Sequence, residues 1–106
     1  MKQKEFFKIL DREGFDRLRV RLAIEKGELI NIVIQYESLL GNKWTTIVRY
    51  DIQHGFFHRD MMTPKGEKIK ISIDISDLNS ATIYAEQDIK DKWEYYKQKY
   101  LKGLKK

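Results

Sequence analysis

The chain has 106 residues, with 21 lysines and arginines against 16 aspartates and glutamates, so its formal net charge is +5. That length fits one domain built on a single core. Because the sequence has no cysteine, disulfides, thiolate metal sites and cysteine nucleophiles are excluded. No apolar run approaches the roughly 18 residues of a membrane span, and the N-terminus lacks the apolar stretch of a signal peptide. We therefore expect a single-domain cytoplasmic protein that does not enter a membrane.

The excess positive charge lies in the last ten residues, which hold five lysines and no acidic residue. Residues 1–96 then balance, with 16 basic against 16 acidic side chains. The macrodipole of a helix favours cations at its C-terminus, so this composition is typical of a helix end. A tail that binds phosphate groups is the alternative.

Alternating apolar and charged side chains over residues 16–25 predict a half-buried strand. Four more strands are predicted at 29–39, 44–52, 56–62 and 68–73, each following a short turn that contains glycine. Five strands joined by short turns predict an antiparallel meander. The first dozen residues fit either a short helix or an extra strand, and we expect a helix.

From Asp77 to about Lys102 the apolar residues recur at steps of three and four, which is the period of one helix stripe. Asp77 or Ser76 fits the N-cap, and Gly103 fits the position where the helix stops. The expected fold class is therefore α+β, a five-stranded antiparallel meander sheet with one long C-terminal helix packed on one face.

The expected helix is longer than the strands, because about 26 helical residues span about 39 Å and a strand of about 8 residues spans about 27 Å. The C-terminal end of the helix should therefore overhang the sheet. That overhang carries Tyr95, Tyr96, Tyr100, Leu101 and Leu104. Exposed apolar patches are unusual in a monomer, so we expect either self-association through this helix or an N-terminal segment packed underneath it.

The strand register follows from keeping the apolar side chains on one face, since a slip of one residue moves every side chain to the other face. Two rows of residues then face away from the helix. The first row is Arg19, Val33, Asp51, His58 and Ser72, and the second is Arg17, Gln35, Arg49, Asp60 and Lys70. Arg59 falls on the inner face opposite Tyr50, so we expect it at the sheet rim or beside a bulge.

The first row places an aspartate, a histidine and a serine on neighbouring strands, and four interpretations are open. Asp51, His58 and Ser72 have the residue types of a hydrolase triad. In metal-independent RNA cleavage, His58 would be the general acid or base while arginine stabilises the phosphorane charge. A divalent metal would find ligand types in Asp51, His54, His58 and Asp60. The fourth interpretation is a solvated charged face with an Asp–His contact, whose alternating charges also resist aggregation.

Residues 49–60 read Arg-Tyr-Asp-Ile-Gln-His-Gly-Phe-Phe-His-Arg-Asp. Together with residues 33–37, this run resembles a family of small archaeal and bacterial proteins of uncharacterised function. A looser resemblance is to the TumE-type toxins of toxin–antitoxin pairs. It is carried by Arg49, Tyr50, Asp51, His54 and His58. The second resemblance implies an RNA target and an antitoxin protein as partner.

These observations lead us to expect a toxin–antitoxin-type protein that acts on RNA, as a metal-independent ribonuclease without a cofactor. The catalytic candidates are His58, Asp51, His54 and Arg49. The candidate nucleic-acid contacts are Arg17, Arg19, Arg21 and Lys70. The alternatives are a non-enzymatic homodimeric interaction module and a divalent-metal-binding protein.

Overall fold

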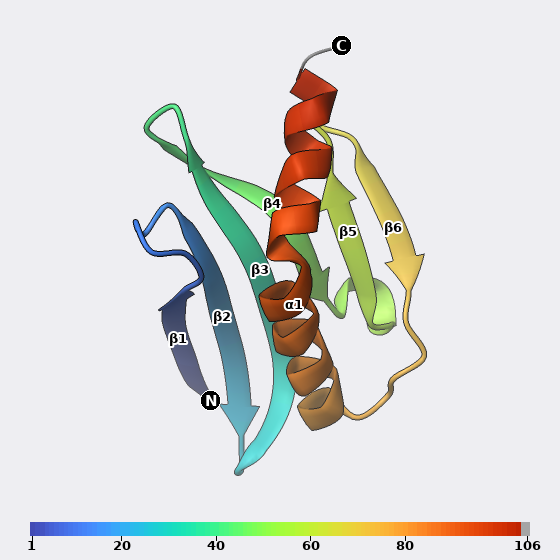
Figure 1. The fold of residues 1–106 in the computed structure, drawn as a ribbon. Helices are drawn as coiled ribbons and strands as arrows, with labels where there is room; N and C mark the ends of the chain where they lie inside the picture. The colour runs from blue at the N-terminus through green and yellow to red at the C-terminus, as the bar shows by residue number, and fades with distance from the viewer. Residues whose placement is uncertain (105–106) are drawn as a thin grey trace.

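The computed structural model describes residues 1–104 as an antiparallel sheet with one long helix on one face (Figure 1). The α+β class and the C-terminal helix are as expected, but the sheet has six strands in the order β1-β2-β3-β4-β5-β6. The elements are β1 (Lys2–Ile9), β2 (Asp16–Glu25), β3 (Glu28–Leu40), β4 (Lys43–Asp51), η1 (Gln53–Gly55), β5 (His58–Met62), β6 (Lys68–Ser72) and α1 (Leu78–Leu104). No helix within these residues is long and apolar enough to span a membrane.

The sixth strand is β1, so the helix predicted for the first dozen residues is wrong. β1 pairs with β2 along its whole length, from Lys2 opposite Ile24 to Ile9 opposite Arg17. Every residue of β1 is exposed, so its apolar residues do not follow a spacing that would distinguish a strand from a helix. Backbone hydrogen bonding to the free edge of β2 decides its conformation instead.

The predicted register holds over most of β3 to β6, where Val48 pairs with Tyr36 on one side and with Met61 on the other. Beside the β3–β4 turn it is wrong by one residue, because the ladder slips between Tyr36 and Glu37 and Leu40 lies opposite Lys43. The β2–β3 register is wrong by two residues, because Arg19 lies opposite Gln35 rather than Val33. Two details account for this shift. The turn has only Lys26 and Gly27 between the paired ends, both at positive φ, and the ladder slips by one residue next to Ala23. Because the total shift is even, each side chain keeps its predicted face.

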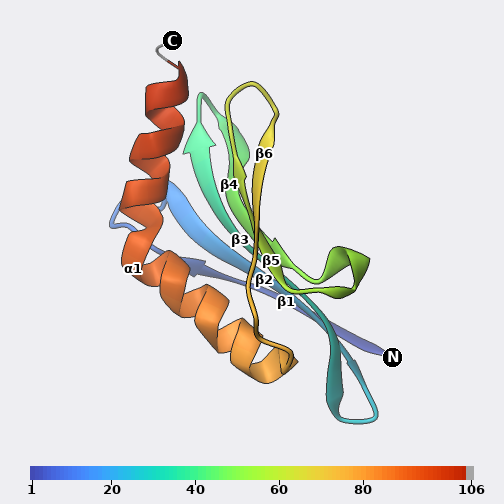
Figure 2. The same ribbon diagram turned by 90° about the vertical axis from the view of Figure 1, so that its right-hand side faces the viewer.

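The helix covers the middle of one sheet face, where it packs against β3 and β4 (Figure 2). Ala81 and Ala85 are fully buried, and their small side chains let the helix approach the sheet closely. The core is formed by Leu18, Val20, Ile32, Ile34, Tyr36, Ile47, Val48, Tyr50, Phe57, Met61, Ala81, Ala85, Ile89 and Tyr96.

Asp88 on α1 anchors the helix to the sheet. Its Oδ2 accepts hydrogen bonds from the Tyr50 hydroxyl at 2.6 Å and the Tyr96 hydroxyl at 2.5 Å, and Arg59 donates to the Tyr96 oxygen at 3.0 Å. Burial and the Asp88 carboxylate raise the pKa of both tyrosines far above the ordinary value, so both hydroxyls stay donors. Arg59 therefore lies opposite Tyr50 as the register requires, but it points under the helix rather than to a rim or bulge.

A second buried carboxylate, Asp16, joins the other end of the helix to the sheet. Its Oδ1 accepts hydrogen bonds from Tyr36 at 2.6 Å and Ser38 at 2.7 Å. Lys97 of α1 reaches Oδ2 at 3.1 Å. One of the five C-terminal lysines therefore contributes to the fold rather than to a free basic tail.

The C-terminal part of α1 rests on the turn between β5 and β6, which lies beside it in Figure 1. Tyr96 is 2% exposed, so the predicted exposure of this residue is wrong, whereas Tyr95 is 59% exposed. Gly103 lies inside the helix instead of ending it. A Cβ atom added to Gly103 would sit 2.9 Å from Pro64 Cδ, so glycine is required here by close packing.

We predict that Gly103→Ala lowers the free energy of unfolding by about 1 kcal/mol, because overpacking against Pro64 outweighs the gain in helix propensity. Urea denaturation of the single variants and of the double variant with Pro64→Ala measures this. In the Pro64→Ala background the same substitution should stabilise the protein. A stabilising effect in the wild-type background would contradict the close contact.

We also predict that Asp88→Ala lowers the free energy of unfolding by about 2–4 kcal/mol, since two buried hydroxyls lose their acceptor. The control is Asp91→Ala, which removes only a hydrogen bond to exposed Gln87. Thermal or urea denaturation compares the two. Equal effects of the two substitutions would show that Asp88 does not anchor the helix.

Candidate functional site

The sheet face opposite the helix contains five polar residues that are almost fully buried. They are Gln35, Glu37, Asp51, His58 and Asp60, and none is more than 4% exposed. The interpretation of this face as simply solvated is therefore wrong at its centre. Arginine side chains from β2 and β4 form ion pairs with Glu37 and Asp51 on this face, and these arginines stay partly exposed.

Asp51, His58 and Asp60 form a compact group, as the predicted β4–β5 register requires. His58 Nε2 lies 2.9 Å from Asp51 Oδ1 and 3.5 Å from Asp60 Oδ2. One oxygen or nitrogen from each residue lies within 4.8 Å of the others. His58 itself is only 1% exposed.

The other ring nitrogen of His58 faces the protein backbone. Nδ1 lies 3.2 Å from the carbonyl oxygen of Phe56, which can only accept a hydrogen bond. This contact assigns the proton to Nδ1 and turns Nε2 toward the two carboxylates. The Phe56 ring lies 5.2 Å from the His58 ring, centre to centre, and helps to cover it.

Asp51 is held ionised by two donors. Arg49 Nε donates to Oδ2 at 2.7 Å, and the backbone N–H of Gln53 donates to Oδ1 at 3.0 Å. Burial by itself would raise the pKa of Asp51, but these hydrogen bonds outweigh burial and hold the pKa below the ordinary value. The Asp51 carboxylate is therefore negative at neutral pH.

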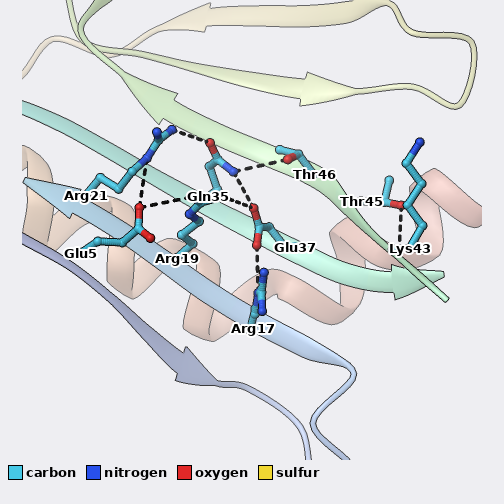
Figure 3. Close-up of polar contacts among 9 residues, drawn as sticks. All are labelled: Glu5, Arg17, Arg19, Arg21, Gln35, Glu37, Lys43, Thr45 and Thr46. Atoms are coloured by element: carbon cyan, nitrogen blue, oxygen red, sulfur yellow. Dashed lines mark hydrogen bonds and ion pairs between the residues drawn. The ribbon is translucent and has the colours of Figure 1, made fainter.

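A polar network continues from this group toward β1, and most of it is drawn in Figure 3. Gln35 Oε1 accepts from Arg49 at 3.2 Å and Arg21 at 3.3 Å, and Gln35 Nε2 donates to Glu37 at 2.8 Å. Glu37 also pairs with Arg17 at 2.9 Å and with Arg19 at 3.5 Å. Buried Gln35 and Glu37 therefore fix the positions of four guanidinium groups.

Of the predicted catalytic residues, the structure brings together Asp51, His58 and Arg49 but not His54. His54 is exposed in the turn with φ of 71° and is not part of the group around His58. Ser72 lies opposite His58 in the register. Both His58 ring nitrogens face other groups, however, so this geometry does not form the catalytic contact of a hydrolase triad.

Of the predicted nucleic-acid contacts, the three arginines on β2 lie side by side on the outer face, whereas Lys70 is on β6 opposite Asp60. Two acidic residues that pair with these arginines were not predicted from the sequence. Glu5, which pairs with Arg19 at 3.1 Å, was missed because β1 was predicted as a helix. Glu37 was missed because the predicted β2–β3 register was wrong by two residues, so Glu37 was not placed opposite Arg17. Its position two residues after Gln35 does place it on the same face.

We predict that diethyl pyrocarbonate modifies His54 at least about tenfold faster than His58, because His58 reacts only after local opening of the structure. Mass spectrometry of digested protein measures both histidines in one sample. Unfolding in denaturant should make the two rates similar. Equal rates in the folded protein would contradict the enclosure of His58.

No curated protein and no solved structure shows significant similarity to the chain. A sequence model of one protein family matches residues 1–106, the whole chain. The chain therefore belongs to the family described as Domain of unknown function (DUF7718).

Proposed function

We propose that the protein binds single-stranded RNA through the outer face of β1 to β4. The observation that carries this proposal is the row formed by Arg17, Arg19 and Arg21 on β2, which is joined by Arg49 on β4. Alternate residues of a strand lie about 7 Å apart, so β2 presents three guanidinium groups at regular intervals along one line. An extended chain of phosphates is the natural partner of such a row.

The guanidinium groups are held in place yet keep donors free. An arginine has five N–H donors, and no arginine of the row gives more than two hydrogen bonds to side chains within the described part of the chain. Their side chains are between 21% and 40% exposed. The Nε atoms of Arg19 and Arg21 are buried, but the remaining donors can reach phosphate oxygens without loss of the internal network, and little side-chain entropy is lost on binding.

Aromatic side chains lie next to the arginine row. The Arg17 guanidinium carbon is 4.4 Å from the Phe7 ring centre and 3.7 Å from the Trp44 ring centre. Phe7 is 44% exposed, so one face of the cluster is open to solvent. Unpaired bases stack on aromatic rings and on guanidinium planes, which makes this cluster suited to single-stranded RNA rather than to a duplex.

The proposal is limited to binding. An RNA backbone cannot reach an imidazole that is 1% exposed, so the buried state of His58 does not support its expected role in cleavage. The ribonuclease activity, the antitoxin partner and self-association through the helix stay predictions. Tyr96 belongs to the core, so it is not available for contact with a second copy of the chain.

We predict that Arg21→Gln weakens binding of a short labelled oligouridine about tenfold at low salt and lowers the salt slope by about 0.7, the value for one phosphate contact on a single strand. Fluorescence anisotropy over a series of salt concentrations measures both quantities. The slope of the wild-type protein should be small, because the four arginines lie among three carboxylates, those of Glu5, Glu37 and Asp51.

The matched control is Lys90→Gln, which also removes one cation but lies on α1, on the other side of the sheet. It should leave both affinity and slope unchanged. Equal losses in the two variants would show that binding depends only on total charge. Absence of binding at low salt would refute the proposed function.

A further inference from the structure

Asp60 has an oxygen that the fold leaves without a partner. Its side chain is 4% exposed, and among the described residues Oδ1 is buried with no hydrogen-bond donor. Its Oδ2 has only a 3.5 Å approach to His58 Nε2. A buried carboxylate without donors costs free energy unless a cation compensates it. Asp60 is therefore the residue of this face whose burial is not compensated by any hydrogen bond within the described residues.

The neighbouring donor atoms fit the coordination shell of a small cation. Zinc binds imidazole nitrogen and carboxylate oxygen at about 2.0–2.2 Å, so ligand atoms at the corners of a tetrahedron are about 3.3 Å apart. The distances from His58 Nε2 to Asp51 Oδ1 and to Asp60 Oδ2, 2.9 Å and 3.5 Å, lie on either side of that value. All three donor atoms fall within 4.8 Å of one another.

The surrounding contacts orient these ligands. A proton held on His58 Nδ1 by the Phe56 carbonyl would leave Nε2 free to supply its lone pair to a cation between the two carboxylates. Metal-bound histidines are usually held by such a contact from their second nitrogen. Arg49 pairs with Asp51 and compensates one of the two negative charges. One negative charge remains for a cation to compensate.

From this geometry we propose that Asp51, His58 and Asp60 bind one divalent transition-metal cation, with Zn²⁺ as the probe. Three protein ligands leave the fourth tetrahedral position for water or another small ligand. The mixture of one nitrogen and two carboxylate oxygens favours Zn²⁺ over Mg²⁺, which binds oxygen ligands. This site is independent of the arginine row and does not depend on RNA binding.

An imidazolium ion at His58 is the competing explanation. It would donate from Nε2 to Asp51 and from Nδ1 to Phe56, so it accounts for those two contacts. It leaves Asp60 with only the 3.5 Å approach of Nε2 to Oδ2, whereas a bound cation would take the Asp60 carboxylate as a ligand. The two explanations therefore differ in what Asp60 contributes, and an isosteric change at Asp60 separates them.

The experiment uses the full chain after removal of metals with a chelator. We expect calorimetric titration with ZnCl₂ to show one equivalent bound and the melting temperature to rise with Zn²⁺. The variant Asp60→Asn should bind Zn²⁺ at least about tenfold more weakly. Without metal it should melt higher than the wild type, because an uncompensated buried charge is replaced by an amide that donates to His58 Nε2.

The controls are His54→Gln and His58→Gln, which each remove one of the two histidines. His54→Gln should keep full Zn²⁺ binding, and His58→Gln should lose it. The proposal is overturned if the wild type binds no Zn²⁺ or if binding is lost with His54 and kept in Asp60→Asn. A lower melting temperature of metal-free Asp60→Asn would also overturn it, because that result identifies Asp60 as the partner of an imidazolium.

Discussion

Alternation of side chains where the centres of β3, β4 and β5 pair, from Tyr36 opposite Val48 to Asp51 opposite His58, is the constraint on which the rest of the structure depends. Each of these strands sends one set of side chains under the helix and the other set to the outer face, and both sets include buried residues. Tyr50 under the helix is thus followed by Asp51 on the outer face. A slip of one residue in any hairpin would exchange the two faces, so the same register that builds the core also assembles the polar network.

Much of the fold follows from sequence patterns because the central strands are half buried and alternate clearly. Turn chemistry and parity give the correct pairing from β3 to β6, except beside the β3–β4 turn, where the ladder slips by one residue after Tyr36. The helical period identifies α1. β1 could not be recognised, because a fully exposed edge strand has no pattern of burial. The β2–β3 register depended on a one-residue slip next to Ala23, and the position of such a slip has no clear mark in the sequence.

The candidate site was predictable to the extent that it depends on register. The approach of His58 to Asp51 follows from the pairing of β4 with β5, and so does the place of Asp60. The burial of these groups was not predictable, because polar residues on a sheet face carry no apolar pattern and the Phe56 ring reaches His58 from the turn before β5. The two faces are therefore stabilised differently. The face under the helix has an apolar core with two groups of tyrosine–aspartate hydrogen bonds, and the outer face is stabilised by charge compensation.

The central claim is that the fold fixes the His58 ring with Nδ1–H on the Phe56 carbonyl and Nε2 between two carboxylates. Long-range ¹H–¹⁵N NMR of the histidine rings, recorded on metal-free protein and after addition of ZnCl₂, tests this most directly. We predict a protonated Nδ1 for His58 in both states, with a change at Nε2 on addition of zinc and none at His54. An unprotonated Nδ1, or a zinc-induced change confined to His54, would contradict the account.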